Sequence, residues 1–322
     1  VAVGFGAGNA DQLGYSVAVG YNSGTISQGL VATAVGANAG NTSQGASSVA
    51  IGSSAASQLQ GNFATAVGAS AGLNRQGANS VAIGYLAGQG TSGSLTDFQG
   101  TNSVAIGSSA GTSNQGTNAV AIGNSAGFTG QGTSAVAIGN SAGYTGQGIY
   151  SVAIGISAGQ ISQALNSVAV GRSAGTSSQG TQSVAVGYSA GQTTQGVNAV
   201  AIGFAAGSNT QGGSAVAIGN NAGATAQQIS AVAIGINAGT TTQGTQSVAV
   251  GLNAGATNQG ANNVGVGVNA GALTQGASSV AVGGNAGRYT QGTSAVAIGT
   301  NAGSGVLSTT FQGNGAVAIG AN

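Results

Sequence analysis

Several residue types are absent from this chain of 322 residues, and their absence narrows what the protein can do. The sequence holds no Pro, Cys, Met, Trp, His, Lys or Glu, and charged residues make up only 2% of it. Without imidazole, thiol or amine groups, the usual reagents of acid–base and nucleophilic catalysis and the usual metal ligands are missing. The sequence therefore predicts a protein that is not an enzyme and has no cofactor and no metal site.

The few charges also limit the partners. They are scattered along the chain, at Asp11, Arg75, Asp97, Arg172 and Arg288, and the net charge is +1. No basic stripe exists that could neutralise phosphates, so we expect no nucleic-acid partner. A membrane-spanning helix needs about 20 successive apolar residues, and Gly, Ser, Asn or Gln interrupts each apolar run after a few positions. We expect no membrane span in this segment.

A repeat of 16 residues organises the chain. Copies of Val-Ala-Val/Ile-Gly or Thr-Ala-Val-Gly begin at residues 1, 17, 33, 49, 65 and 81, then at 104 and every 16 residues to 296, with a last copy at 317. The unit reads V-A-[VI]-G-x-[NS]-A-G-x-x-x-Q-G-x-x-[SA], and its positions are numbered 1 to 16 below. We predict one repetitive domain over residues 1–322. Because the chain starts at Val1 without a signal peptide and ends within a repeat, we expect a fragment of a longer fibre.

The length of the repeat indicates the fold class. It is too short for helix-turn-helix repeats of about 34 residues or propeller blades of about 40, and its Gly and β-branched residues disfavour helix. We predict an all-β parallel β-solenoid, a two-layer β-roll of about twenty 16-residue coils. Positions 1 to 3 form the first strand, the Ala-Gly at positions 7 and 8 makes a corner, and the variable positions 9 to 11 form an outer loop.

Two coils carry extra residues within 89–98 and within 304–311, between the Ala-Gly corner and the Gln. Insertions are tolerated where the backbone is exposed, so we expect both to be loops in solvent. They are candidate receptor contacts, through Leu95, Asp97 and Phe98 in one loop and Val306, Leu307 and Phe311 in the other. The alternative is surface variation or contact with an adjoining chain.

Position 12 is Gln in every full repeat. In a stack of coils, each amide can donate to one neighbouring amide and accept from another. We expect a structural Gln ladder rather than a ligand site. We expect the recurrent Asn or Ser at position 6 to form similar hydrogen bonds between neighbouring coils. The ladder includes Gln12, Gln28, Gln44, Gln115, Gln131, Gln147, Gln179, Gln195, Gln243 and Gln259.

The first strand bears on assembly. Positions 1 and 3 face one side of a strand and position 2 the other. A sheet with one wet face alternates apolar with polar residues, yet position 2 is Ala in every copy except Gly265. One face packs inside the thin coil, and we expect the other to be covered by further copies of the chain in a closed lateral homo-oligomer. The alternative is that Ala is simply a small exposed residue.

The repeat also resembles a known family. Residues 79–84 and 102–107 both read NSVAIG, which looks like the head repeat of YadA-like trimeric autotransporter adhesins and of related phage and viral tail-fibre β-rolls. The resemblance implies a left-handed β-roll, three chains around a three-fold axis, and an attachment rod on a cell or virion surface. It also implies that strands such as Val104, Ala105 and Ile106 lie toward the trimer core.

We therefore expect an extracellular structural and adhesive fibre segment that binds a host or cell surface through many weak sites. The partner would be a glycan or a cell-surface receptor. Aromatic rings at position 5 are candidates for stacking on sugars, namely Tyr21, Tyr85, Tyr188 and Phe204. The alternative is that they are exposed or interface-filling rings.

Two other functions remain open. The Gln column, the near neutrality and the open coil ends would suit a self-assembling, amyloid-like extracellular matrix or sheath fibre. An ice-binding solenoid is the third reading, but it requires a flat, regular array of Thr. The sequence offers Thr only in fragments such as 193–194 and 240–242.

Overall fold

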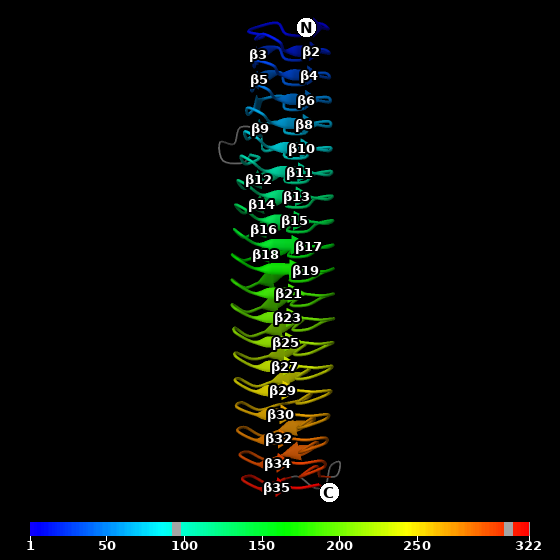
Figure 1. The fold of residues 1–322 in the computed structure, drawn as a ribbon, viewed down its shortest axis with the longest axis vertical. Coiled ribbons are helices and arrows are strands. Elements are labelled where there is room, and N and C mark those ends of the chain that lie inside the picture. Colours follow the sequence, from blue (N-terminus) through cyan, green and yellow to red (C-terminus); the bar gives the residue numbers. More distant parts are fainter. Residues whose placement is uncertain (92–97, 306–311, 322) are drawn as a thin grey trace. The chain divides into compact units, whose positions relative to one another are not determined.

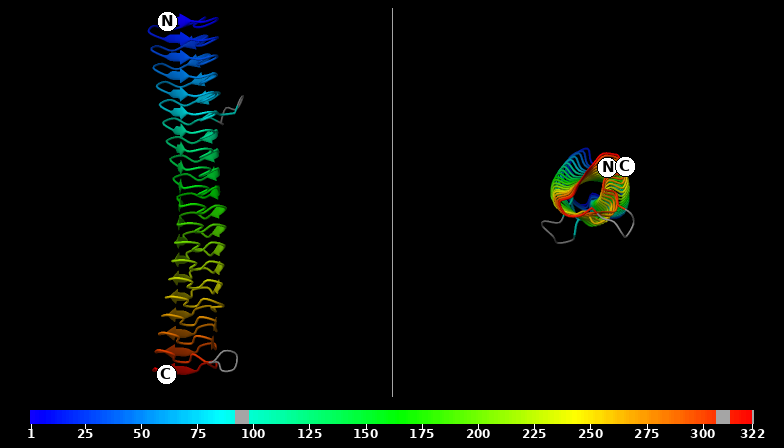
Figure 2. Two further views of the ribbon diagram at one scale, coloured as in Figure 1. Left: turned by 90° about the vertical axis from the view of Figure 1, so that its right-hand side faces the viewer. Right: turned by 90° about the horizontal axis from the view of Figure 1, so that it is seen from below.

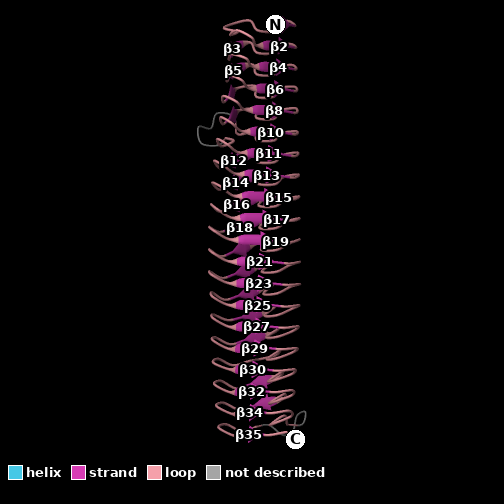
Figure 3. Ribbon diagram, viewed as in Figure 1, coloured by secondary structure: helices cyan, strands magenta, loops and turns pink. Residues whose placement is uncertain are grey.

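The computed structural model describes residues 1–91, 98–305 and 312–321. They form two compact units, Val1–Asn166 and Ser167–Asn322. Within each unit the described residues form short strands joined by turns, with no helix, and each coil lies directly on the next (Figures 1 and 3). The predicted all-β parallel β-solenoid is confirmed.

In the first unit, each coil contributes a first strand from positions 1 to 3 and, in most coils, a second strand that ends at the Gln. The first strands are β1 (Ala2–Val3), β2 (Val17–Val19), β4 (Thr33–Val35), β6 (Val49–Ile51), β8 (Thr65–Val67), β10 (Val81–Ile83), β11 (Val104–Ile106), β13 (Val120–Ile122), β15 (Val136–Ile138) and β17 (Val152–Ile154). The second strands are β3 (Ile26–Gln28), β5 (Thr42–Gln44), β7 (Leu59–Gln60), β9 (Arg75–Gln76), β12 (Ser113–Gln115), β14 (Thr129–Gln131), β16 (Thr145–Gln147) and β18 (Ile161–Gln163).

The second unit repeats this plan. Its first strands are β19 (Val168–Val170), β21 (Val184–Val186), β23 (Val200–Ile202), β25 (Val216–Ile218), β27 (Val232–Ile234), β29 (Val248–Val250), β30 (Val264–Val266), β32 (Val280–Val282), β34 (Val296–Ile298) and β35 (Val317–Ile319). Its second strands are β20 (Ser178–Gln179), β22 (Thr194–Gln195), β24 (Thr210–Gln211), β26 (Ala226–Gln227), β28 (Thr242–Gln243), β31 (Thr274–Gln275) and β33 (Thr290–Gln291). Figure 2 shows the coils of each unit as successive parallel layers.

All strand pairs within a unit are parallel, and equivalent repeat positions pair with one another. Ala121 of β13 pairs with Ala137 of β15, for example. The insertions leave this register intact, since β10 pairs with β11 across one of them and β34 with β35 across the other. The ladder depends on repeat position, not on the number of residues between coils.

The Gly at position 4 is required by both conformation and space. At Gly203 the φ angle is +128°, a value that residues other than Gly rarely adopt. A Cβ atom there would lie 2.6 Å from the carbonyl oxygen of Gly219 in the next coil. The stacking distance between coils therefore excludes any side chain at this position.

The two faces of the first strand differ from what the exposed-Ala alternative predicts. The Ala at position 2 points inward and is completely buried in β2, β13 and β25, as at Ala18, Ala121 and Ala217. The flanking Val and Ile residues point outward and are half-buried or exposed, as at Ile202, which is 38% exposed. Exposed Ala is therefore wrong, and the outward face carries the larger apolar residues.

Part of the expected outer loop is a second strand, and the φ angle at position 11 differs between coils. Asn258 has φ +52° there, a left-handed conformation that Asn tolerates and β-branched residues avoid. A positive φ at this position is compatible with a strand, since Asn114 and Ser162 have it within β12 and β18. The Thr residues at the same position in β28 and β31, in the two flanking coils, do not have it, so the Asn258 coil differs from both neighbours. Between those strands, the Asn258 coil keeps only isolated bridges through Gln259, so the second sheet of this unit is interrupted at that coil.

Candidate functional site

The Gln residues lie inside the coils. From Gln28 to Gln312, each Gln at position 12 is buried. In all of them the side-chain Nε2 donates a hydrogen bond to the backbone carbonyl at position 1 of the same coil, as from Gln227 to Val216 at 2.7 Å. The amide thus crosses the interior from the second strand to the first. This contact leaves the Gln side chains out of reach of a ligand outside the coil.

Bonds between Gln side chains occur in runs. One run joins Gln195, Gln211, Gln227 and Gln243, with Nε2 to Oε1 distances of 3.1 to 3.2 Å. Shorter runs join Gln12 to Gln28 and Gln44, and Gln115 to Gln131. At Gln147 and Gln179 the side-chain oxygen has no hydrogen-bond partner. The contact that recurs in every coil is therefore the one to the backbone.

A second amide column runs along the surface of the second unit at position 6. Five hydrogen bonds of 3.0 to 3.4 Å connect Asn221, Asn237, Asn253, Asn269, Asn285 and Asn301 in order. These residues have φ near +55°, a conformation in which Asn is enriched among residues other than Gly. The column presents half-buried amides to solvent at the turn after the first strand.

The position 5 rings stack mainly on each other. Tyr188 and Phe204 are parallel, with ring centroids 5.2 Å apart, and Phe5 and Tyr21 are stacked at 5.7 Å. The guanidinium of Arg172 lies 5.6 Å from the Tyr188 centroid, so both faces of that ring are in contact. Among the described residues, Tyr85 has no ring partner and is 58% exposed.

Sequence reasoning missed a third stacked pair. Phe128 and Tyr144 at position 9 lie 4.9 Å apart and nearly parallel. Their spacing of 16 residues was the available signal, because equivalent positions of adjacent coils must be neighbours. These half-buried rings pack against each other much as those at position 5 do, which reduces the contact of both rings with water.

Most of the candidate receptor-contact residues in the two insertions lie outside the described residues, namely Leu95, Asp97, Val306, Leu307 and Phe311. Phe98 is described and half-buried, and the guanidinium of Arg75 lies 5.2 Å from the centroid of its ring. A cation over an aromatic face is a favourable contact. It ties the end of the first insertion to the neighbouring coil.

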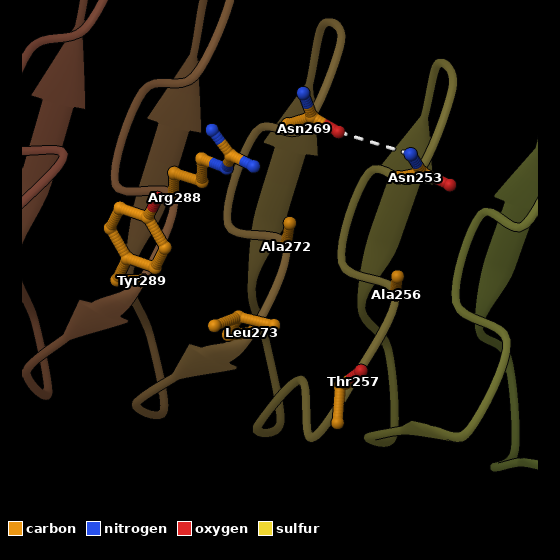
Figure 4. A pocket seen from close by; sticks show the side chains of 8 residues that line it. All are labelled: Asn253, Ala256, Thr257, Asn269, Ala272, Leu273, Arg288 and Tyr289. Carbon is orange, nitrogen blue, oxygen red and sulfur yellow. Dashed lines mark hydrogen bonds between the residues drawn. The ribbon is translucent and has the colours of Figure 1, made fainter. Parts of the chain in front are cut away.

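A surface hollow of about 350 Å³ lies beside the interruption at Asn258. The small side chains of Ala256 and Ala272 occupy position 9 in two coils, and Arg288 occupies it in the next. Figure 4 shows the Arg288 side chain reaching from its own coil toward Asn269. The step from Ala to Arg at one repeat position creates the hollow.

Ala256 and Ala272 form the floor of the hollow, and two different edges flank it. On one side Asn253 donates to Asn269 at 3.1 Å as part of the amide column, and on the other lie Leu273 and Thr257 (Figure 4). The ring of Tyr289 lies 5.0 Å from the Arg288 guanidinium. The hollow therefore combines one cation, two amides and apolar carbon surface.

The described residues contain no cluster of three or more His, Cys, Asp or Glu side chains that could hold a metal ion. Within that same part of the chain, no helix is long and apolar enough to cross a bilayer.

These features define a class of protein: a parallel β-solenoid whose interior is held together by hydrogen bonds from Gln and whose surface carries columns of polar and apolar residues. Residues 99–126, 162–190 and 226–254 match the family described as YadA head domain repeat (2 copies). Over these three segments the chain is similar to YadA head repeats, which confirms the resemblance to that family predicted from NSVAIG. No curated protein sequence gives a significant match to the chain.

Proposed function

We propose that the chain is a structural and adhesive segment of a surface-displayed extracellular fibre, working as a homo-trimer whose chains meet through the outward face of the first strands. The observation that carries this proposal is the Val and Ile column on that face. It is supported by the match to YadA head repeats, a family of trimeric adhesins. Binding would be non-enzymatic and multivalent.

The outward apolar column repeats in every coil. Position 1 is Val in every coil except those of Thr33 and Thr65. With the Val or Ile at position 3 it pairs in parallel register, as in Val200 with Val216 and Ile202 with Ile218. The Ile side chains remain substantially exposed, at 38% for Ile202, 37% for Ile234 and 40% for Ile298. Soluble monomers rarely leave a continuous apolar patch of such extent open to water. Lateral packing between copies would cover it, and a closed ring limits the number of copies.

Two charged substitutions test this interface. We expect the double variant Ile154→Asp and Ile202→Asp to lower the solution mass from three chains to one, because the two carboxylates would be desolvated between apolar faces. The measurement is sedimentation velocity or light scattering after size exclusion. As a matched control, Thr145→Asp and Thr210→Asp place the same charges on exposed positions of the second strands and should leave the mass unchanged.

The same experiment separates the alternatives. A single-chain mass for the unaltered protein would contradict the trimer. An open size distribution that grows with concentration would instead favour the matrix or sheath fibre.

Beads coated with the trimer should adhere to animal cells more strongly than beads coated with an equal amount of the Ile154→Asp, Ile202→Asp variant, because avidity rises with valency. If neither coating adheres to any cell type tested, the adhesive function is wrong.

Ice binding has less structural support. Thr194 and Thr210 pair across adjacent second strands, as do Thr274 and Thr290. Ala226 and Asn258 interrupt the column between those pairs, so the Thr array does not extend regularly through the unit.

A further inference from the structure

The charge of Arg288 has no counterpart in its own unit. Residues 167–322 contain no Asp and no Glu, and Arg172 and Arg288 are their two cations. Among the described residues, the contact found for the Arg288 guanidinium is the Tyr289 ring. A guanidinium stays charged at any physiological pH and offers five N–H donors suited to an anion with several oxygens. The hollow is thus positively charged and lacks an acidic side chain.

The amide column leaves hydrogen-bonding capacity open at the same place. Asn253 and Asn269 each donate one N–H and accept one bond within the column, at 3.0 to 3.1 Å. A carboxamide has two N–H donors and two acceptor lone pairs. Each Asn therefore retains one donor and one acceptor, the combination that recognises neighbouring hydroxyl groups.

The remaining surface of the hollow is apolar. Leu273 is 40% exposed, the ring of Tyr289 is half-buried, and Ala256 and Ala272 form a low floor between the two edges. The hollow spans three coils, a width of about 10 Å at the spacing of adjacent strands. Its volume of about 350 Å³ is at the small end of ligand pockets. These dimensions suit one or two sugar rings.

We propose that this hollow binds an acidic saccharide unit, a pyranose carrying a carboxylate or a sulfate. Arg288 binds the anionic group, the amides of Asn253 and Asn269 bind ring hydroxyls, and Leu273 and Tyr289 contact the C–H face of the sugar. The inference names a ligand class for the adhesive function proposed above and rests on it for biological meaning.

The site can be tested by titrating the full chain with three methyl glycosides: a glucuronide, a sulfated galactoside and a neutral glucoside. Binding is measured by calorimetry and by saturation-transfer NMR. We expect one or both acidic glycosides to bind, and the neutral one to bind at least tenfold more weakly. The acidic glycoside that binds identifies the anionic group. Arg288→Gln should reduce its affinity about tenfold or more, as for loss of a charged hydrogen bond.

Matched variants separate a built site from general charge attraction. Arg172→Gln removes a cation that also lies over a Tyr ring, outside the hollow, and should change affinity less than twofold. Ala272→Leu should abolish binding by filling the floor, and position 9 accepts Leu73 in another coil, so the fold tolerates it. Ala224→Leu makes the same change at position 9 in a coil outside the hollow and should bind normally.

Equal binding of all three glycosides, binding of none, or equal losses in Arg288→Gln and Arg172→Gln would overturn the inference. The adhesive function can fail separately. Coated beads that adhere to cells equally well with and without Arg288→Gln contradict this site alone. An acidic glycoside that binds in solution while the beads adhere to no cell contradicts the adhesive function alone.

Discussion

Replacing Gly203 with Ala should destabilise the second unit by about 2–6 kcal/mol. Strain at its φ of +128° contributes about 1–3 kcal/mol, and overpacking against the Gly219 carbonyl oxygen, 2.6 Å from the new Cβ atom, contributes about 1–3 kcal/mol more. The measurement is the midpoint of thermal unfolding, together with amide hydrogen exchange in the coils around residue 203. We expect faster exchange on both sides of the substitution.

Gly284→Ala is the matched control. Gly284 occupies the position directly after the turn glycine in its own coil, and a Cβ atom there would meet nothing within 4 Å. Its φ is not in the left-handed region, so the change should alter stability by less than about 0.5 kcal/mol, as for an ordinary surface substitution. Similar losses in both variants would show that glycine content matters and that close stacking at position 4 does not.

Gln227→Leu should lower the free energy of unfolding by about 2–4 kcal/mol although the new side chain is apolar and of similar volume. The two N–H groups of the Gln227 amide are shared among three buried acceptors: the carbonyls of Val216 at 2.7 Å and Ala231 at 3.1 Å, and the Oε1 of Gln243 in the next coil at 3.1 Å. Leu would leave these acceptors, and the Gln211 amide that donates to Gln227, without that partner in a buried interior. Thermal unfolding and hydrogen exchange of the flanking coils measure the effect.

The same chemical change on the surface provides the comparison. Gln192 occupies position 9, is half-buried, and lies where another coil carries Leu73. Gln192→Leu should therefore change stability by less than about 0.5 kcal/mol. If Gln227→Leu were equally harmless, the Gln column would be a filler of the interior rather than its hydrogen-bonded brace.

Much of this architecture was accessible from the sequence because a solenoid converts sequence period directly into spatial neighbourhood. Fixed residues at positions 3, 4 and 12 predicted the coil, its parallel stacking and the interior Gln. The 16-residue spacing also contained the stack of Phe128 on Tyr144, which the sequence reasoning did not extract. Each of these features follows from local pattern alone, since every coil contacts mainly its neighbours.

The candidate site was less accessible. Arg288 and Tyr289 are adjacent in sequence, but the hollow beside them depends on the small side chains of Ala256 and Ala272 in preceding coils. The residues at positions 9 to 11 vary from coil to coil without a repeating pattern, so the sequence contained no repeated signal for the hollow. The relevant signal was the change from Ala to Arg along one repeat position.

By itself, the sequence determined the repeat, the strand register, the Gly that stacking requires and the near absence of chemically reactive groups. Only the tertiary structure decided which face of the first strand is inside. Alternation divides a strand into two faces but does not say which one meets the opposite layer. Here the Gln side chain crosses the narrow interior to the first strand, which leaves room for Ala at position 2 and directs Val and Ile outward.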